Sequence, residues 1–290
     1  MPPTRNNGRI TRLVIDLIVA VYLAFTAGLL VQFRNAIEPW FWLVVLHVTL
    51  ITGIIALQRV QKLQTPVIGF IRDWYPVFLV SPLFKEVELL ATVVGNWSLT
   101  GHIQELESLI FGVQWSLQLS EVLPYPLVSE YLHFCYISYI LLLPLVGGIW
   151  YFRQRWAEFD RLILLAITTY LLSYLFFIFF PVDSPFYLVP PPGEPLAGHF
   201  FYELVHWVSS RGGARGGAFP SSHVSVSIVV WLTAFRYDRR LAYLLLPIVL
   251  GIAVATVYGR FHYVLDVVAG GLLAIVILLI HRFIESLQAR

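Results

Sequence analysis

Long apolar runs dominate this chain and restrict what it can fold into. Seven of them lie near residues 13–33, 39–57, 131–152, 162–181, 223–236, 241–259 and 263–283. Each is close to the ~20 residues with which a helix crosses a bilayer. Only 12% of the residues are charged, whereas soluble domains typically carry about 25%. Because helices pair all their backbone groups internally, we expect an all-α polytopic membrane protein.

The basic residues between these runs predict how the chain crosses. Arginine and lysine collect on cytoplasmic loops, which places the N-terminus and the arginine-bearing loops 153–161 and 236–240 in the cytoplasm. A weaker run at 66–84 must then cross as well, which gives eight crossings with both ends inside. We expect residence in a cell membrane of the bacterial inner type, with the 182–221 loop on the periplasmic or extracellular side.

Two segments between the runs differ from the rest in composition. Residues 86–129 mix glutamates with large apolar side chains, a pattern typical of amphipathic helices on the outer interface. Residues 182–221 are rich in proline and glycine, and long connections of this kind tend to carry function. We expect an N-terminal pair of transmembrane helices within residues 1–62, and a six-helix membrane domain over 63–290 that includes both segments.

Two histidines begin apolar runs on the predicted outer side. His223 ends the stretch Gly-Ala-Phe-Pro-Ser-Ser-His, and His262 lies four residues before Asp266. On a helix, this spacing stacks the imidazole and the carboxylate on one face. A carboxylate at one imidazole nitrogen fixes the tautomer and raises the basicity of the other nitrogen. The pattern predicts a catalytic site of His223, His262 and Asp266.

The residues around these histidines also predict an anion site. Ser221 and Ser222 precede an expected helix, and serine is a good N-cap. The free N–H groups and positive dipole of a helix N-terminus suit phosphate. Arg260 adds a planar fork of N–H donors that matches phosphate oxygens. We expect Ser221, Ser222 and Arg260 to bind the phosphate of a substrate.

The two histidine segments resemble signatures of a known family. Residues 217–223 are similar to the second signature, and residues 258–270 to the third signature, of the type 2 phosphatidic acid phosphatase (vanadium haloperoxidase-like) superfamily. Within it, they most resemble the branch of the inositol phosphorylceramide synthases. The resemblance implies a six-helix membrane core, here with two extra N-terminal helices. It also implies a metal-free reaction in which His262 attacks phosphorus, Asp266 orients it and His223 protonates the leaving oxygen.

The chain departs from the wider family at the phosphate clamp. The usual first signature is a lysine followed by Arg-Pro, and no Arg-Pro pair occurs in this sequence. The family also places an arginine where Thr256 stands here, while this chain has Arg260. Both departures fit the synthase-like branch better than simple lipid phosphatases. Lys85 and Arg215 are the candidates that we expect to complete the clamp.

These observations predict a metal-independent phosphoric ester hydrolase or phosphotransferase without a cofactor. Its substrate would be a phosphorylated membrane lipid, and its acceptor water or an alcohol, with transfer of an inositol-phosphate-type headgroup as one possibility. Nucleic acid is not an expected partner. The alternatives are a transporter, or a non-catalytic membrane protein with the same fold. The runs after residue 130 carry almost no charge besides Asp266, and all three catalytic candidates are present, so we favour the enzyme.

Overall fold

The computed structural model describes residues 9–59, 65–94, 97–189 and 200–288. The secondary structure of these residues is helical apart from one isolated bridge between Val182 and Gly217. The helices are α1 (Arg9–Gln32), α2 (Trp40–Arg59), α3 (Pro66–Val94), α4 (Thr100–Phe111), α5 (Trp115–Val122), α6 (Pro126–Phe152), α7 (Trp156–Phe179), α8 (Pro185–Leu188), α9 (Phe200–Gly212), α10 (Ser222–Tyr237), α11 (Arg239–Tyr258) and α12 (Val264–Gln288).

The expected all-α membrane fold is confirmed. Six of the described helices, α1, α2, α6, α7, α11 and α12, are long and apolar enough to cross a bilayer, and the protein is an integral membrane protein. The other two predicted crossings correspond to α3, which carries buried charges, and to α10, which has 16 residues. Both pack against spanning helices, α3 against α1 and α7, and α10 against α6, α7, α11 and α12. Together with α6, α7, α11 and α12, they form the six-helix core.

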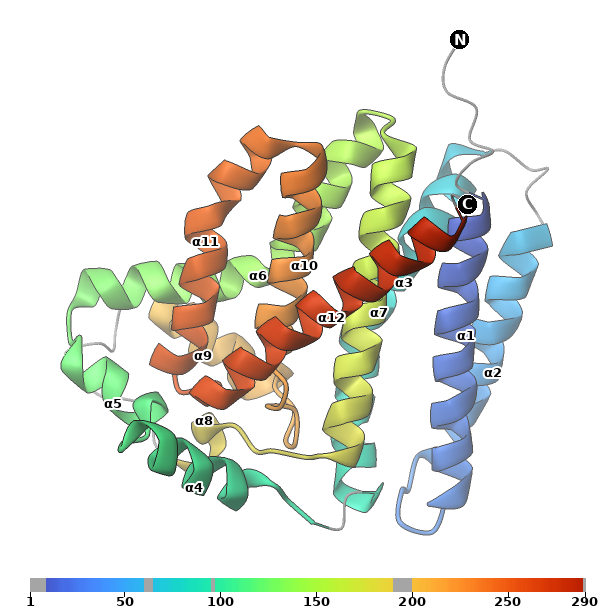
Figure 1. Ribbon diagram of the computed structural model, residues 1–290. Helices are drawn as coiled ribbons and strands as arrows, with labels where there is room; N and C mark the ends of the chain where they lie inside the picture. The colour runs from blue at the N-terminus through green and yellow to red at the C-terminus, as the bar shows by residue number, and fades with distance from the viewer. Residues whose placement is uncertain (1–8, 60–64, 95–96, 190–199, 289–290) are drawn as a thin grey trace.

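The N-terminal helices α1 and α2 pair with each other and lie beside the core along α3 and α7 (Figure 1). Buried polar contacts attach them. Arg12 of α1 lies 2.7 Å from a carboxylate oxygen of Asp73 and 3.1 Å from one of Asp160. Farther along, His47 of α2 lies 3.2 Å from Glu86 of α3. Charges at such depth are costly unless they are paired, so these contacts specify where the pair docks.

The two ends of the bundle differ in character. The short helices α4, α5 and α8 gather at one end, while the α6–α7 and α10–α11 turns lie at the other end with the start of α1 (Figure 1). Asp238 joins the two turns, because Arg153 and Arg155 approach its carboxylate to 3.9 and 3.7 Å. The two arginine-rich turns are therefore neighbours, on the side opposite α4 and α5.

The segment at 86–129 differs from the expected interfacial helices in its first part. α3 continues to Val94, because Glu86 has a buried partner in His47 and does not need to reach water. In the described part of this segment, the separate short helices are α4 and α5, and α4 is amphipathic. Its Leu109 is 81% exposed, whereas Glu107 is fully buried. On α4 the buried face thus includes a carboxylate and the exposed face is partly apolar.

Candidate active site

His262 lies in the turn between α11 and α12, where the main chain and one neighbouring loop fix it. The carbonyl of Thr256 accepts the N–H groups of both Phe261 and His262 at 2.9 Å. The imidazole Nδ1 lies 2.9 Å from the carbonyl oxygen of Ala218 and 3.4 Å from Oδ2 of Asp266. Because a carbonyl can only accept, Nδ1 carries the proton. Nε2 is therefore left with a lone pair, as a nucleophile requires.

His223 lies in the first turn of α10, next to His262. Ser221 caps this helix, since its hydroxyl accepts the N–H of Val224 at 3.4 Å. Nδ1 of His223 is 3.3 Å from Nε2 of His262. Two tyrosine rings of α6 cover the His223 ring, with centroids 4.8 Å away for Tyr136 and 4.3 Å for Tyr139. The two histidines thus meet through the nitrogens that the chemistry would use.

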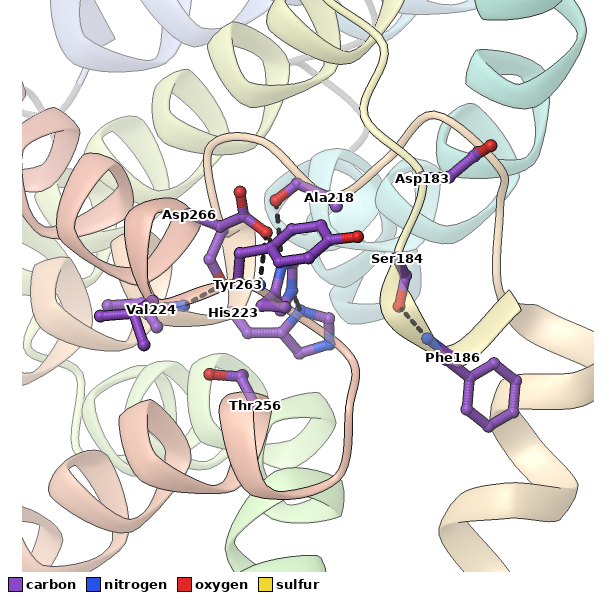
Figure 2. Close-up of polar contacts among 12 residues, drawn as sticks. Asp183, Ser184, Phe186, Ala218, His223, Val224, Thr256, Tyr263 and Asp266 are labelled. Carbon is purple, nitrogen blue, oxygen red and sulfur yellow. Dashed lines mark hydrogen bonds and ion pairs between the residues drawn. The ribbon is translucent and has the colours of Figure 1, made fainter. Parts of the chain in front are cut away.

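Asp266 ties the two motif-bearing helices together. It is fully buried in the first turn of α12. Its Oδ2 accepts the N–H of Tyr263 at 2.8 Å, and its main-chain carbonyl accepts the N–H of Ser221 at 2.9 Å. The carboxylate therefore belongs to the start of α12 as much as to the imidazole, and Figure 2 shows Asp266 next to Tyr263. The main chain of Asp266, in turn, holds the helix cap of α10.

A short bridge positions the carbonyl that holds His262. Val182 donates its N–H to the carbonyl of Gly216 at 3.1 Å and accepts the N–H of Ala218 at 3.0 Å. Asp183 Oδ1 accepts the N–H of Gly216 at 2.9 Å. Gly216 has a φ of 77°, a conformation that favours glycine. The two ends of the predicted 182–221 loop thus meet beside the imidazole.

The expected phosphate ligands lie in two places. Ser221 and Ser222 are buried beside the histidines. Arg260, with a φ of 63°, is also buried, and its Nη2 lies 3.3 Å from both the Leu117 carbonyl and Glu121 on α5. Lys85 and Arg215 belong to a neighbouring exposed cluster. Lys85 Nζ donates to the carbonyl of Gly213 at 2.6 Å, and the Arg215 guanidinium lies 5.6 Å from the ring centre of Tyr187.

Two residues of α4 contact the site although the sequence motifs do not include them. Glu107 Oε1 accepts the N–H of Val264 at 2.8 Å. Gln104 Nε2 donates to the hydroxyl of Tyr263 at 2.9 Å. Burial raises the pKa of Glu107, and the nearby charge of Asp266 raises it further, against the lowering effect of the Val264 N–H. The sequence carries one signal for these two residues: their three-residue spacing puts them on the same face of a helix.

Fold and site together define a polytopic helical membrane protein with a two-histidine centre at one end of its bundle. The family model described as the PAP2 superfamily matches residues 102–280, more than half of the chain. The chain therefore belongs to the PAP2 superfamily, whose members are generally metal-independent phosphatases. The matched part begins in α4 and contains His223, His262 and Asp266. No curated protein and no solved structure matches the chain.

Proposed function

We propose that this protein is a metal-independent lipid phosphatase or phosphotransferase that works through a phosphohistidine on His262. One observation carries the proposal. The Ala218 carbonyl holds the proton on Nδ1 of His262, at 2.9 Å, while Nε2 faces the second histidine. That tautomer is the one in which Nε2 can attack phosphorus, and membership of the superfamily supports phosphoryl chemistry.

The reaction then proceeds in two displacements. Nε2 of His262 attacks phosphorus, the bond from phosphorus to the leaving oxygen breaks, and His223 gives that oxygen a proton. In the second step, water or an alcohol loses its proton to His223 and attacks phosphorus, and the P–N bond breaks. Asp266 stabilises the positive imidazole of the intermediate. Because the two imidazoles are in contact at 3.3 Å, the phosphoryl group displaces that contact when it binds.

The negative charge of the phosphate would be met from several directions. The N–H groups at the start of α10, behind Ser221 and Ser222, form an anion site of the kind that helix N-termini provide. Arg260 supplies a guanidinium from the turn before His262. We assign Lys85 and Arg215 to the approach of the substrate, since both lie in the exposed cluster around Gly213.

Transfer to an alcohol, including the transfer of an inositol-phosphate-type headgroup, is the second candidate. The observation that favours it is the aromatic cover of His223. Tyr136 stacks on His223 and also on Phe261, whose ring centre is 4.1 Å from that of Tyr136. Such a cover surrounds the second displacement with rings, which would favour an alcohol held by its own contacts with the protein over free water. The missing Arg-Pro pair and the Thr256 departure point in the same direction, towards the synthase-like branch.

The test uses purified protein in liposomes. Phosphatidic acid is supplied as one substrate and a diacyl phospholipid with or without inositol as another, and the lipid products are measured by mass spectrometry. We expect product formation with a chelator present, and loss of it in His262→Ala. Phosphatidic acid that carries radioactive phosphorus should leave an acid-labile label on the protein, which would identify the phosphohistidine intermediate. Absence of any product, or activity that depends wholly on added divalent metal, would contradict the proposal.

A further inference from the structure

The start of α12 is held from outside by a residue of α4. Glu107 is fully buried, and its Oε1 accepts the N–H of Val264, the first residue of α12, at 2.8 Å. Its other oxygen is buried too, without a hydrogen-bond partner in the part of the chain that the structure describes. The Glu107 carboxylate is shielded from water, so contact with solvent does not account for it. Its hydrogen bond to the start of α12 therefore needs an explanation.

The first turn of α12 needs such a partner. Helices begin with N–H groups that lack an acceptor within the helix. Asp266 reaches back to the N–H of Tyr263, at 2.8 Å, which is half of a capping box. Tyr263 precedes the helix but has no short side-chain acceptor, and its hydroxyl accepts from Gln104 instead. Glu107 supplies the missing acceptor for Val264 from another helix.

The helix that carries Glu107, α4, is also hydrogen-bonded to the segment that leads to Ala218. The N–H of Leu99, just before α4, donates to the carbonyl of Pro181 at 3.0 Å. Thr100 Oγ1 accepts the N–H of Asp183 at 2.9 Å, directly after the bridge that holds Ala218. α4 is therefore bonded to both segments that position the imidazole of His262.

We propose that Glu107 is a positioning residue of this enzyme, which caps α12 in trans and thereby holds Asp266 and His262 in their reactive arrangement. This inference rests on the proposed function. Glu107 touches neither substrate nor the reacting nitrogen, and it acts through the main chain of Val264. To cap α12, residue 107 needs an oxygen that accepts the N–H of Val264. Glutamine keeps such an oxygen in its amide and removes the negative charge.

Four forms of the full-length protein test the role in liposomes: wild type, Glu107→Leu, Glu107→Gln and Glu105→Leu. Glu105 is exposed on the same helix and serves as the matched control. We expect Glu107→Leu to lower kcat about 10- to 100-fold, the scale of a small misplacement of reacting groups, with KM almost unchanged. Glu107→Gln should restore most of the rate. Wild-type kcat in Glu107→Leu, or a Glu107→Gln as slow as Glu107→Leu, would overturn the proposal.

Hydrogen exchange of the segment 262–268 provides a readout without activity. Its amides should exchange faster in Glu107→Leu than in the wild type, and Glu107→Gln should protect them again. If the wild type proves inactive on every lipid phosphate while this pattern holds, the proposed function fails and the cap stands. If the wild type is active but these amides exchange equally fast in the wild type and in Glu107→Leu, the cap is refuted and the proposed function stands.

Discussion

A main-chain carbonyl, rather than the aspartate, makes the shortest contact with Nδ1 of His262. Nδ1 of His262 lies 2.9 Å from the Ala218 oxygen and 3.4 Å from Asp266 Oδ2. In a serine protease triad, replacing the aspartate by asparagine leaves the wrong tautomer and removes most of the rate. Here the tautomer is set by a group that no side-chain substitution removes, so the remaining contribution of Asp266 to the imidazole is its charge, beside its hydrogen bond from the N–H of Tyr263.

This geometry predicts an order of effects. His262→Ala should abolish turnover, and His223→Ala should lower it about 10²- to 10⁴-fold, as expected for the loss of an acid–base group. Asp266→Asn should cost less than His262→Ala, because the Ala218 carbonyl still holds the proton on Nδ1. Phosphate release in liposomes measures all three, with His102→Ala on the exposed part of α4 as control. An Asp266→Asn variant as inactive as His262→Ala would show that the aspartate sets the tautomer.

The residues of the site were predictable to different degrees. His223, His262 and Asp266 lie within short motifs, so the sequence already marked them. The predicted stacking of His262 and Asp266 on one helix is corrected, because α12 begins at Val264 and His262 lies in the turn before it, where its imidazole still approaches the carboxylate to 3.4 Å. The contact of Glu107 joins residues 157 positions apart in the sequence, and a glutamate on an amphipathic helix is ordinarily expected to face water. For the same reason the sequence motifs do not include Tyr136 and Tyr139, since an aromatic residue in a membrane helix carries no mark of what it covers.

At the scale of elements, the close approach of α12 to the start of α10 holds the two histidine segments in place. A Cβ added to Gly270 would lie 2.5 Å from the carbonyl oxygen of Ser221, the N-cap of α10. The next residue is different, because a Cβ on Gly271 would meet only the end of Ile228 at 3.8 Å. One methyl group at Gly270 must therefore displace backbone next to His223.

The two glycines form a matched pair for experiment. Gly270→Ala should destabilise the protein by about 1–3 kcal/mol, as overpacking of a close contact does, and should reduce activity as well. Gly271→Ala should be neutral or slightly stabilising, because alanine favours helix over glycine. Thermal unfolding in detergent and turnover in liposomes measure the difference. Equal stability and equal activity of the two variants would contradict the close approach of α12 to the start of α10.

Element boundaries followed the apolar runs closely where no buried charge intervened. The first two runs correspond to α1 and α2. The run predicted to end at 84 continues instead as α3 to Val94. Lys85, Glu86 and Glu88 suggested an end of the helix at this point, but Glu86 is buried with His47 of another helix. A charge can be recognised as paired only when its partner is known, and this partner belongs to the N-terminal pair.

At the scale of the whole molecule, the charges divide the bundle into two ends. The arginine-rich turns 153–161 and 236–240 lie together at the end opposite α4 and α5 (Figure 1). By the positive-inside rule, we expect that end to face the cytoplasm. We therefore expect the two histidines on the periplasmic or extracellular side, where they would act on lipid of the outer leaflet.

Single cysteines in a Cys135→Ser background check this orientation. Cys135 is buried, so its replacement removes only background labelling. Ser210→Cys on α9 and Arg240→Cys at the start of α11 both lie at exposed positions. An impermeant thiol reagent applied to intact cells should label the first and spare the second. The reverse pattern would invert the topology and assign the substrate to the inner leaflet.

The bridge between Val182 and Gly217 has a consequence for engineering and for evolution. It fastens both ends of the excursion between residues 183 and 215 with two main-chain hydrogen bonds, directly beside Ala218. The ends of the excursion are thus joined by main-chain groups, and the side chain of Asp183 also bonds the bridge. Exposed positions of the excursion such as Ser210 can diverge without moving the carbonyl that holds His262. If the proposed function holds, we expect substrate preference to change through such exposed positions while the phosphoryl chemistry stays constant.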